Sequence, residues 1–474
     1  MDAADRAARQ RLHDLRATGT VIRSVSHDSR TVREGDLYAC LRGDSFDGHD
    51  FAGEAVRAGA TALLVDHELP ASVAGGAAQV VVDDTRRRLG PIAAEIAGHP
   101  SRQLTTVGVT GTNGKTTTTH LLAAVFDAAA RPTGIIGTLA GARTTPEAPE
   151  LQAALAGFVE EGRRAAVLEV SSHALALHRV DGTEFDAVVF TNLGRDHLDL
   201  HGTTEEYFRA KARLFDPSFS SLGVVNVDDP YGRVLADAAS SDDPPFRVVP
   251  VSIDDAADVE VEADRHRYRW RGVDVEVPLG GRFNVANSLA ALTTAVELGI
   301  DVETARAGLA TAPTVPGRFE VITDGETTVV VDYAHTPDGL AGLLESARAL
   351  AGRRAGGAVI VVFGCGGDRD VDKRPQMGAV AEAAADRVIV TSDNPRHEDP
   401  AAIVGQIVAG TTDPDRVTAI VDRREAIAHA VSIAGAGDVV VIAGKGHETT
   451  QDLGDRVVDF DDRTVARTLL EERS

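Results

Sequence analysis

An apolar run from Leu104 to Val109 leads through a glycine-rich loop into a helical run from Thr116 to Ala130. A strand that opens directly onto such a loop and a helix begins a βα unit, and βα units build parallel sheets with crossover helices. The loop reads GVTGTNGKT and ends in Lys115 and Thr116. Its amides and the helix N-terminus can cradle phosphates, with Lys115 at the β- and γ-phosphates and Thr116 at Mg²⁺. We therefore expect a parallel nucleotide-binding sheet.

The loop departs from the common phosphate-loop pattern at one position. The pattern GxxxxGK[ST] requires glycine at position 109, where the chain has Val109, and the nearest glycine is Gly108. An incidental glycine loop is the alternative interpretation. The strand-to-helix setting argues against it.

The length of 474 residues predicts about three α/β domains. Residues 1–101 alternate short apolar runs with helical stretches, which indicates a small α/β domain. Residues 102–315 hold the nucleotide-binding sheet. Residues 316–474 alternate five apolar strands with helical segments, the pattern of a Rossmann-like doubly wound sheet.

Four polar motifs directly follow strands of the last domain. They are YAHTPD from Tyr333, GCGGDRD from Gly364, SDNPR from Ser392 and GKGHE from Gly444. Ligands of doubly wound sheets bind outside the carboxyl ends of the strands. The four motifs are therefore expected to line one edge of the sheet.

The composition excludes several classes of protein. A net charge of −24 repels polyanions, so we expect no nucleic-acid partner. No apolar run approaches the roughly 20 residues that cross a bilayer, so no stable membrane insertion is expected. The first residues are charged rather than apolar, and Cys40 and Cys365 are too few for a disulfide framework. These features predict a cytoplasmic protein.

Lysine is rare in this chain. Of 48 basic residues only four are lysine, namely Lys115, Lys211, Lys373 and Lys445, and all four lie in motifs. A position that keeps lysine among so many arginines is one that needs a compact ammonium or an amine that can lose its proton.

The variant loop GTNGKTT resembles that of the Mur ligases, a family that includes folylpolyglutamate synthase. Matching segments follow along nearly the whole chain: EVSSH from Glu169, TNL from Thr191, DHLD from Asp196, AK from Ala210, NVDD from Asn226, GRFNVAN from Gly281, PGR from Pro316 and DYAHTP from Asp332. The resemblance implies an ADP-forming ligase of peptidoglycan synthesis. It would join meso-2,6-diaminopimelate to UDP-N-acetylmuramoyl-L-alanyl-D-glutamate through an acyl phosphate, with ATP as co-substrate. We expect it to act as a monomer on these small molecules.

A metal site is expected beside the phosphates. Glu169 and His197 offer oxygen and nitrogen ligands for a divalent ion. A structural histidine is the alternative for His197, and the neighbouring loop favours the metal. The resemblance implies Mg²⁺ as the metal, with Thr116 as a further ligand and Lys211 carbamylated to help hold a second ion. It also makes Lys115, Lys211, His197 and Glu169 the catalytic group.

For ATP, the resemblance implies contacts along the loop and from two later segments. The residues are Gly111, Thr112, Asn113, Gly114, Lys115, Thr116, Thr117, Asn284, Arg318 and Asp332, with Asn287 as a further candidate for adenine. Helix capping or turn formation is the alternative for the asparagines.

The acceptor nucleotide is expected to bind the first two domains. By resemblance, Ser29, Asp44, Ser45 and Phe46 would hold the UDP moiety, and Thr144, Thr145, Ser171, Arg179 and Lys211 the muramoyl peptide. Two departures concern this region: the segment between Gly137 and Thr144 is shortened, and Leu177 stands where some members carry glutamine.

The choice of amino acid is expected to depend on the DNPR motif. Diaminopimelate differs from lysine by a distal carboxylate, which the planar guanidinium of Arg396 can bind through paired hydrogen bonds. By resemblance the pocket comprises Arg369, Asp393, Asn394, Pro395, Arg396, Gly444 and Glu448, with Glu448 at the ammonium. A surface turn is the alternative for Asp-Asn-Pro. Lys373 and Lys445 are expected in salt bridges at the domain interface.

Three other functions share parts of this pattern. A lysine-adding ligase would differ only in the DNPR pocket. A folylpolyglutamate synthase would share the ATP core without a UDP-binding first domain. A non-ligating P-loop regulator would bind or hydrolyse ATP alone.

Overall fold

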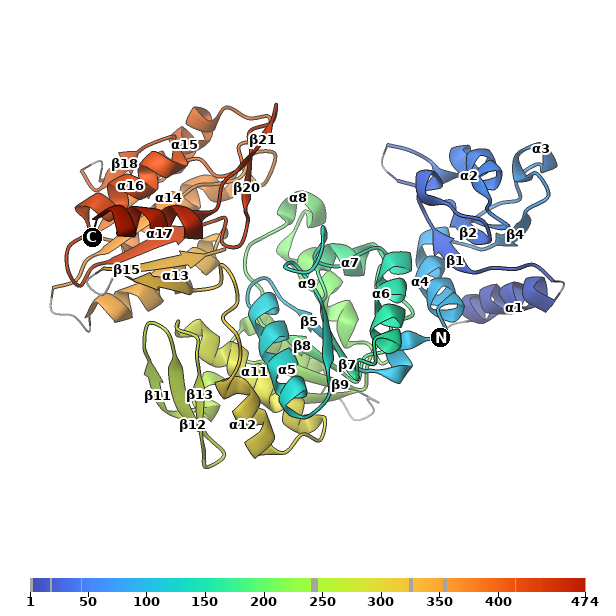
Figure 1. Ribbon diagram of the computed structural model, residues 1–474, viewed down its shortest axis with the longest axis horizontal. Helices are drawn as coiled ribbons and strands as arrows, with labels where there is room; N and C mark the ends of the chain where they lie inside the picture. Colours follow the sequence, from blue (N-terminus) through green and yellow to red (C-terminus); the bar gives the residue numbers. More distant parts are fainter. Residues whose placement is uncertain are drawn as a thin grey trace.

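The computed structural model describes residues 3–17, 19–43, 45–239, 246–323, 327–352, 356–413 and 415–473. Asp44, expected at the UDP moiety, lies outside these residues. Three α/β units follow one another along the chain, with the central unit between the other two (Figure 1). This confirms the predicted fold class. Among the described residues, no helix has the length and apolar character needed to cross a bilayer.

The first unit is a four-stranded parallel sheet in the order β1-β2-β3-β4. Its elements are α1 (Ala3–Ala17), β1 (Ser24–Ser26), β2 (Asp36–Ala39), α2 (Ala52–Ala58), β3 (Ala62–Val65), α3 (Ala71–Ala74), β4 (Ala78–Val81) and α4 (Thr85–Ile96). Every residue of β2 and β3 is buried, as expected of parallel strands covered on both faces. Helices α1 and α4 contribute to the core on one face, and α2 and α3 to that on the other.

The central unit is a six-stranded parallel sheet in the order β10-β9-β8-β5-β7-β6. Its strands are β5 (Thr105–Thr110), β6 (Thr133–Ile136), β7 (Ala165–Glu169), β8 (Ala187–Phe190), β9 (Leu222–Asn226) and β10 (Arg247–Val251). One face packs on α5 (Lys115–Ala128), α11 (Phe283–Glu297) and α12 (Val302–Ala310), and the other on α6 (Ala148–Glu160) and α7 (Ser172–Ala176). Three further helices are α8 (Leu198–His201), α9 (Thr204–Ala212) and α10 (Pro230–Ala239).

An antiparallel sheet extends the central unit and was absent from the sequence-based prediction. It consists of β11 (Ala257–Val261), β12 (His266–Trp270) and β13 (Val273–Val277). In β12 buried His266, Tyr268 and Trp270 alternate with more exposed arginines. The alternation is that of a strand with one covered face, and the polar residues between hide it from a search for apolar runs.

The C-terminal unit is doubly wound, as predicted, with the strand order β14-β15-β19-β16-β17-β18. The strands are β14 (Glu320–Thr323), β15 (Thr328–Asp332), β16 (Val359–Phe363), β17 (Arg387–Val390), β18 (Val417–Ala419) and β19 (Val439–Ala443). All pairs are parallel except the edge pair of β14 and β15, which was not predicted.

Helices cover both faces of the C-terminal sheet. One face packs on α13 (Pro337–Gly352), α14 (Lys373–Ala384) and α15 (Pro400–Val408). The other packs on α16 (Arg423–Ile433) and α17 (Asp462–Arg473), which lie side by side (Figure 1). A hairpin of β20 (Thr450–Asp452) and β21 (Val457–Asp459) follows β19.

Candidate active site

The loop between β5 and α5 is built around two glycines that no other residue can replace without movement. Gly111 has a φ of 149°, and a Cβ there would lie 1.9 Å from Thr191 Oγ1. Gly114 has a φ of 83°, and its Cβ would lie 2.4 Å from Asn287 Oδ1. Both positions therefore need glycine for backbone conformation and for space.

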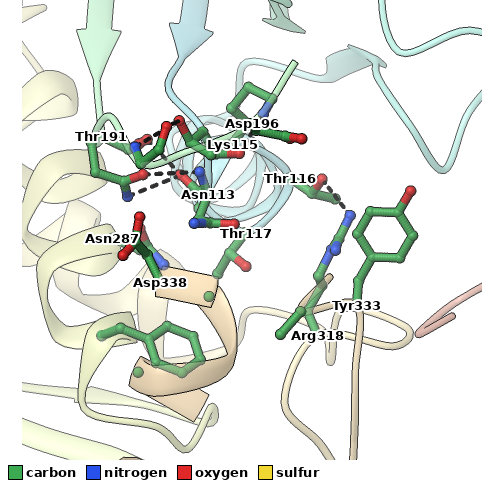
Figure 2. Close-up of a pocket in the computed structure, with 18 of the residues that line it drawn as sticks. Asn113, Lys115, Thr116, Thr117, Thr191, Asp196, Asn287, Arg318, Tyr333 and Asp338 are labelled. Atoms are coloured by element: carbon green, nitrogen blue, oxygen red, sulfur yellow. Dashed lines mark hydrogen bonds between the residues drawn. The ribbon is translucent and has the colours of Figure 1, made fainter. Parts of the chain in front are cut away.

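Residues after β8 hold the loop in place. Thr191 Oγ1 donates to the Asn113 carbonyl over 2.6 Å, and the Asn113 amide donates to Asn192 Oδ1 over 2.9 Å (Figure 2). The Gly194 amide donates to Thr112 Oγ1 over 2.9 Å. The sheet order explains these hydrogen bonds. Because β8 is the neighbour of β5, the segments that follow the two strands lie side by side.

A cavity of about 570 Å³ lies between the central and C-terminal units. The loop lines one side, and Arg318, Asp332 and Tyr333 line it from the C-terminal unit. Figure 2 shows Arg318 reaching Thr116 with the Tyr333 ring beside it; the Arg318 guanidinium lies 4.4 Å from the Tyr333 ring centroid and donates to Thr116 Oγ1 over 3.1 Å. The structure therefore brings together most of the residues expected at ATP: Thr112, Asn113, Gly114, Lys115, Thr116, Thr117, Arg318 and Asp332.

Gly111 and Asn284, the other two expected residues, do not line the cavity. Asn284 lies in α11. It is fully buried, its Nδ2 donates to the Gly280 carbonyl, and its Oδ1 accepts from Asn287 Nδ2 over 2.8 Å. Asn287 lines the cavity and Asn284 does not. The expected direct contact of Asn284 with the nucleotide is therefore wrong for this geometry; Asn284 orients Asn287.

Two lysines converge beneath the loop. Lys115 Nζ donates to the carbonyls of Gly111 and Thr112, both over 2.9 Å, and Lys211 Nζ donates to the Gly111 carbonyl over 2.8 Å. Lys211 is 1% exposed and lies 4.6 Å from the Tyr207 ring centroid. Burial, and then the charge of Lys115, lower the pKa of Lys211 well below its ordinary value.

Glu169 ends β7 against the start of α5. Its carboxylate accepts from Thr116 Oγ1 over 3.0 Å and from the amide and hydroxyl of Thr138 over 2.8 and 3.1 Å. Thr138 was missed by the sequence analysis; it lies in the shortened segment, and no motif marked it. Two oxygen-bearing side chains, Thr116 and Glu169, thus meet on the cavity wall, a donor set that suits a hard divalent cation.

His197 lines the same cavity beside Asp196. Its Nε2 lies 3.3 Å from Asp196 Oδ2, and its φ is 53°. Burial, with the nearby His173 and lysines, lowers the pKa of His197 to about 4, so the ring is neutral at pH 7 and can act as a ligand. Asp196 also faces His335 of the C-terminal unit over 3.6 Å.

The residues expected at the muramoyl peptide form a connected group. Thr145 Oγ1 accepts from the Ser171 amide over 3.1 Å, and Thr144 Oγ1 lies 3.0 Å from Thr138 Oγ1. Arg179 donates to the Thr145 carbonyl and pairs with Glu147 over 2.9 Å. Of these, Thr144 and Ser171 line the cavity, whereas Lys211 lies beneath it.

The residues expected at the UDP moiety lie in the first unit. Ser29 begins a short 3-10 helix, and Ser45 and Phe46 are exposed, Phe46 by 73%. Phe46 contacts only the edge of the Phe51 ring among the aromatic pairs of the described chain. An apolar ring exposed to this degree is available for stacking on a ligand.

The residues expected at the amine come together at the carboxyl edge of the C-terminal sheet. Asn394 Nδ2 donates to Glu448 Oε2 over 2.8 Å, and the Gly367 amide donates to the Asn394 carbonyl over 2.9 Å. Arg396 donates to the Gly367 carbonyl over 2.6 Å. A Cβ at Gly444 would lie 2.5 Å from Asp393 Oδ2. Three of the four predicted motifs therefore meet here; the fourth, from Tyr333, lines the 570 Å³ cavity instead.

Lys445 forms the expected salt bridge, with Glu448 over 2.9 Å, but it does so within the C-terminal unit rather than at the domain interface. It is fully buried, and its Nζ donates to Asn394 Oδ1, Glu448 Oε2 and the Thr450 carbonyl over 3.3, 2.9 and 2.6 Å. The sequence placed Lys445 beside Glu448 but could not show that its side chain turns inward.

Contacts across the cleft link the segment after β8 to the C-terminal unit. Arg195 of the central unit lies 3.5 Å from Asp370 and 3.7 Å from Asp372, and its amide donates to Asp338 over 3.1 Å. Arg369, an exposed member of the expected pocket, is close enough to His173 to contribute to the lowering of its pKa. Arg195 therefore links the segment after β8 to the loop that carries Arg369.

One further cluster of metal-type ligands lies in the first unit. Ligand atoms of His49, Asp66 and His67 lie within 4.8 Å of one another, the one such group among the described residues. Asp66 Oδ1 lies 3.2 Å from His49 Nε2 and 2.6 Å from His67 Nδ1, Asp66 Oδ2 lies 2.9 Å from Arg42 Nε, and His49 also pairs with Asp47. These contacts give the polar side-chain groups of the cluster partners within the protein. We therefore interpret the cluster as an ion-pair network.

The Mur ligase family catalytic domain matches residues 21–96, the Mur ligase middle domain residues 109–295, and the Mur ligase glutamate ligase domain residues 317–446. The chain is 45% identical to the UDP-N-acetylmuramoyl-L-alanyl-D-glutamate–2,6-diaminopimelate ligase of Gloeobacter violaceus, with 98% of both chains covered. It is 43% identical to the ligase of the same name from Streptomyces coelicolor, covering 95% of this chain and 93% of the other.

Solved structures also match this chain over nearly its full length. A structure of a ligase with that name matches with a TM-score of 0.67 and 36% identity over 95% of each chain. The MurF ligase of Thermotoga maritima in complex with ADP shares the fold, with a TM-score of 0.66 and 22% identity over 96% of this chain and 99% of the other. With matches to three successive family domains and near full-length relatives above 40% identity, the chain belongs to the Mur ligase family.

Proposed function

We propose that this chain is a ligase of the MurE type, which joins meso-2,6-diaminopimelate to UDP-N-acetylmuramoyl-L-alanyl-D-glutamate with conversion of ATP to ADP and phosphate. The observation that carries the proposal is the joint geometry of two sites. A phosphate loop lines a cavity closed by Arg318 from the C-terminal unit, and the DNPR motif lies at the carboxyl edge of that same unit. Relatives of this name over nearly the full chain support it.

The reaction begins when the free carboxylate of the acceptor's D-glutamate attacks the γ-phosphorus of ATP. The bond to the β-phosphate oxygen breaks, ADP leaves, and an acyl phosphate forms. Lys115 and the loop amides offset the charge that develops on the phosphoryl oxygens. For this, Lys115 must leave the carbonyls of Gly111 and Thr112 and turn toward the phosphates.

The second step forms the amide. The amine of the L-centre of diaminopimelate attacks the activated carbonyl, phosphate leaves from the tetrahedral intermediate, and the nitrogen loses a proton. The pocket holds the distal end of the amino acid, with Arg396 at the carboxylate and Glu448 at the ammonium. Binding at the distal end orients the reacting amine toward the acyl phosphate. Orientation of reactants accounts for a large part of the rate enhancement in reactions between two bound molecules.

Mg²⁺ would bind next to the phosphates through Thr116, Glu169 and His197. When bound, it supplies positive charge that stabilises the transferring phosphoryl group. Thr116 and Glu169 already meet over 3.0 Å, and the lowered pKa of His197 keeps that ring neutral. Arg318 now donates to Thr116, so its guanidinium must withdraw from this hydroxyl for the metal to bind there.

Lys211 would carry a carbamate, formed when its neutral amine attacks CO₂ and the nitrogen loses a proton. Carbamylation requires a neutral amine, and burial together with Lys115 lowers the pKa of Lys211 in that direction. The product is an anion, which would turn a repulsion between two lysines into an attraction. Arginine offers no equivalent chemistry, in keeping with lysine at this position.

We further propose that the units divide into residues 1–101, which bind UDP, residues 102–315, which bind ATP, and residues 316–474, which bind the amino acid. Ser29, Ser45 and Phe46 would hold the UDP moiety; Thr144, Thr145, Ser171 and Arg179 would hold the muramoyl peptide. The enzyme would act as a cytoplasmic monomer. Because Arg195 and Arg318 bridge the cleft, ATP entry requires the C-terminal unit to move away and close again.

Phosphate release tests the proposal. ATP and UDP-N-acetylmuramoyl-L-alanyl-D-glutamate are supplied with meso-diaminopimelate, with L-lysine or with no amine. We expect turnover with meso-diaminopimelate, at most slow turnover with L-lysine, and none without amine. Equal use of both amines would contradict the assigned pocket, and phosphate release independent of amine and acceptor would contradict ligation altogether.

A further inference from the structure

The two largest fully buried side chains of the described residues are Arg374 and Arg423. A buried guanidinium is costly, and a buried ion pair is weak support for stability because apolar residues of similar volume often serve as well. Both arginines lie in the C-terminal unit and directly behind the expected amine pocket. Their contacts indicate what they do there.

Arg423 joins two loops of the pocket. Its Nη1 donates to the Ser392 carbonyl over 3.1 Å, and its Nη2 donates to the Ala443 carbonyl over 2.9 Å. Ser392 immediately precedes the DNPR motif, and Ala443 immediately precedes the GKGHE motif. The strands that lead to them, β17 and β19, are not neighbours, because β16 lies between them. Arg423 therefore spans a strand to tie the two loops together.

The position of Arg423 is unfavourable for its own helix. It is the first residue of α16, where the helix dipole disfavours a cation. Asp462, the first residue of α17, compensates this charge with bonds of 2.8 and 2.7 Å, and both side chains are fully buried. The pair thus fixes the guanidinium in one orientation, aimed at the two carbonyls.

Arg374 holds the third loop, which carries the GCGGDRD motif, in a similar way. Its Nη2 donates to the Gly366 carbonyl over 3.2 Å, within the GCGGDRD motif. It also binds Glu398 through bonds of 2.7 and 2.8 Å, two residues after Arg396. Glu398 in turn accepts from the Asp368 amide over 2.6 Å. Arg374 therefore fixes the loop of Arg369 relative to the loop of Arg396.

We propose that Arg374 and Arg423 are positioning residues for amino-acid selection, holding the main chains of the three pocket loops at fixed separations. This inference rests on the proposed function. Discrimination between diaminopimelate and lysine requires Arg396 and Glu448, which come from different loops, to be correctly spaced for one carboxylate and one ammonium. A site that is loose by about 1 Å loses much of its selectivity.

Steady-state kinetics of variants tests this. Arg423→Lys keeps a cation opposite Asp462 but cannot reach both carbonyls, and the double variant Arg423→Met with Asp462→Leu removes the buried charges together. Arg424→Ala is the matched control, because Arg424 is the exposed neighbour. KM is measured for meso-diaminopimelate, ATP and acceptor, with the ratio of kcat/KM for meso-diaminopimelate to that for L-lysine. Thermal melts establish folding.

We expect the KM for meso-diaminopimelate to rise at least about tenfold in the folded Arg423 variants, and the preference over L-lysine to fall by a similar factor. KM for ATP and for acceptor should stay within about twofold, as should all constants of Arg424→Ala. A folded variant with wild-type KM and preference, or with all three KM values raised equally, would overturn the inference.

Two further outcomes are distinguishable. Wild-type enzyme that does not use meso-diaminopimelate would overturn the proposed function itself, and with it this inference. If neither Arg423 variant folds, Arg374→Lys tests the inference instead, because it leaves the pair of Arg423 and Asp462 intact. We expect the same rise in the KM for meso-diaminopimelate and the same loss of preference over L-lysine. A folded Arg374→Lys variant with wild-type KM and preference would overturn the inference.

Discussion

Lys115 and Lys211 donate hydrogen bonds to the same oxygen atom, the carbonyl of Gly111, over 2.9 and 2.8 Å. Two ammonium groups on one acceptor repel each other, and Lys211 is fully buried as well. Its lowered pKa follows from both causes, burial first. Lys115 is the partly exposed member and lines the cavity, whereas Lys211 lies behind the loop. The pair thus combines a cation for phosphate with an amine suited to modification.

Replacement of Lys211 by alanine or arginine is expected to lower phosphate release at least about a hundredfold, because the carbamate that would complete the metal site is lost. A short-chain carboxylate should partly rescue Lys211→Ala, since it can occupy the vacated space, and should not rescue Lys211→Arg. Arg209→Ala is the control, because Arg209 lies on the same helix and is 71% exposed. Wild-type rates in Lys211→Ala would remove the carbamate from the mechanism.

Replacement of Arg396 by alanine should raise the KM for meso-diaminopimelate by about a hundredfold or more. The distal carboxylate would be left without its guanidinium partner in a desolvated pocket. The KM for ATP should change little, since Arg396 does not line the ATP cavity. Arg456→Ala, on the exposed hairpin of the same unit, serves as the control. An unchanged KM for meso-diaminopimelate would show that Arg396 does not bind it.

His266 is expected to make the free energy of unfolding depend on pH. It is fully buried between Ser288 and the Leu279 carbonyl, and burial lowers its pKa from 6.5 to about 4. The unfolded chain therefore binds an extra proton between these values, so this contribution to stability is complete above pH 6.5 and is lost as the pH falls toward 4. The loss amounts to about 3 kcal/mol.

Urea unfolding at pH 7 and at pH 4 measures the contribution of His266 to the free energy of unfolding. The free energy of unfolding of the wild type should fall by about 3 kcal/mol more than that of His266→Gln, because the variant lacks the titrating ring. His13→Gln is the control, since the His13 side chain is 55% exposed. Equal pH dependence of wild type and His266→Gln would contradict the assignment.

Gly90 is expected to fix how the first unit packs on the central one. A Cβ at Gly90 would lie 2.0 Å from the Asp181 carbonyl oxygen, a main-chain atom that cannot turn aside. Gly90→Ala should therefore cost about 1–3 kcal/mol of stability. It should also raise the KM for the acceptor, which is proposed to span both units.

Thermal melts and acceptor kinetics check this expectation. Gly157→Ala is the matched substitution, because Gly157 is also helical and no atom lies within 4 Å of its added Cβ. That variant should be neutral or more stable by up to about 1 kcal/mol. An equal response of the two variants would show that the contact at Asp181 is unimportant.

The sequence by itself determined the local structures and their order. The strand that contains Gly108, the glycines of the loop and the helix after it are encoded within about twenty-five residues, and the structure has them at residues 105–128. The five predicted strands of the C-terminal unit are present, and β15, β16 and β19 are continuous apolar runs buried on both faces. The antiparallel sheet of β11, β12 and β13 was missed because one-sided burial leaves only an alternating pattern. The edge strand β14 was missed because it has only two apolar residues, Val321 and Ile322.

Only the tertiary structure decided which side chains meet. Asn284 and Asn287 lie three residues apart on one helix, so periodicity puts them on the same face but cannot say which one reaches the cavity. Lys211 meets Gly111 across 100 residues of sequence, and Lys445 turns inward although its motif is polar. Such contacts depend on how whole sheets and helices pack, and packing is a property of the assembled core that no short stretch of sequence contains.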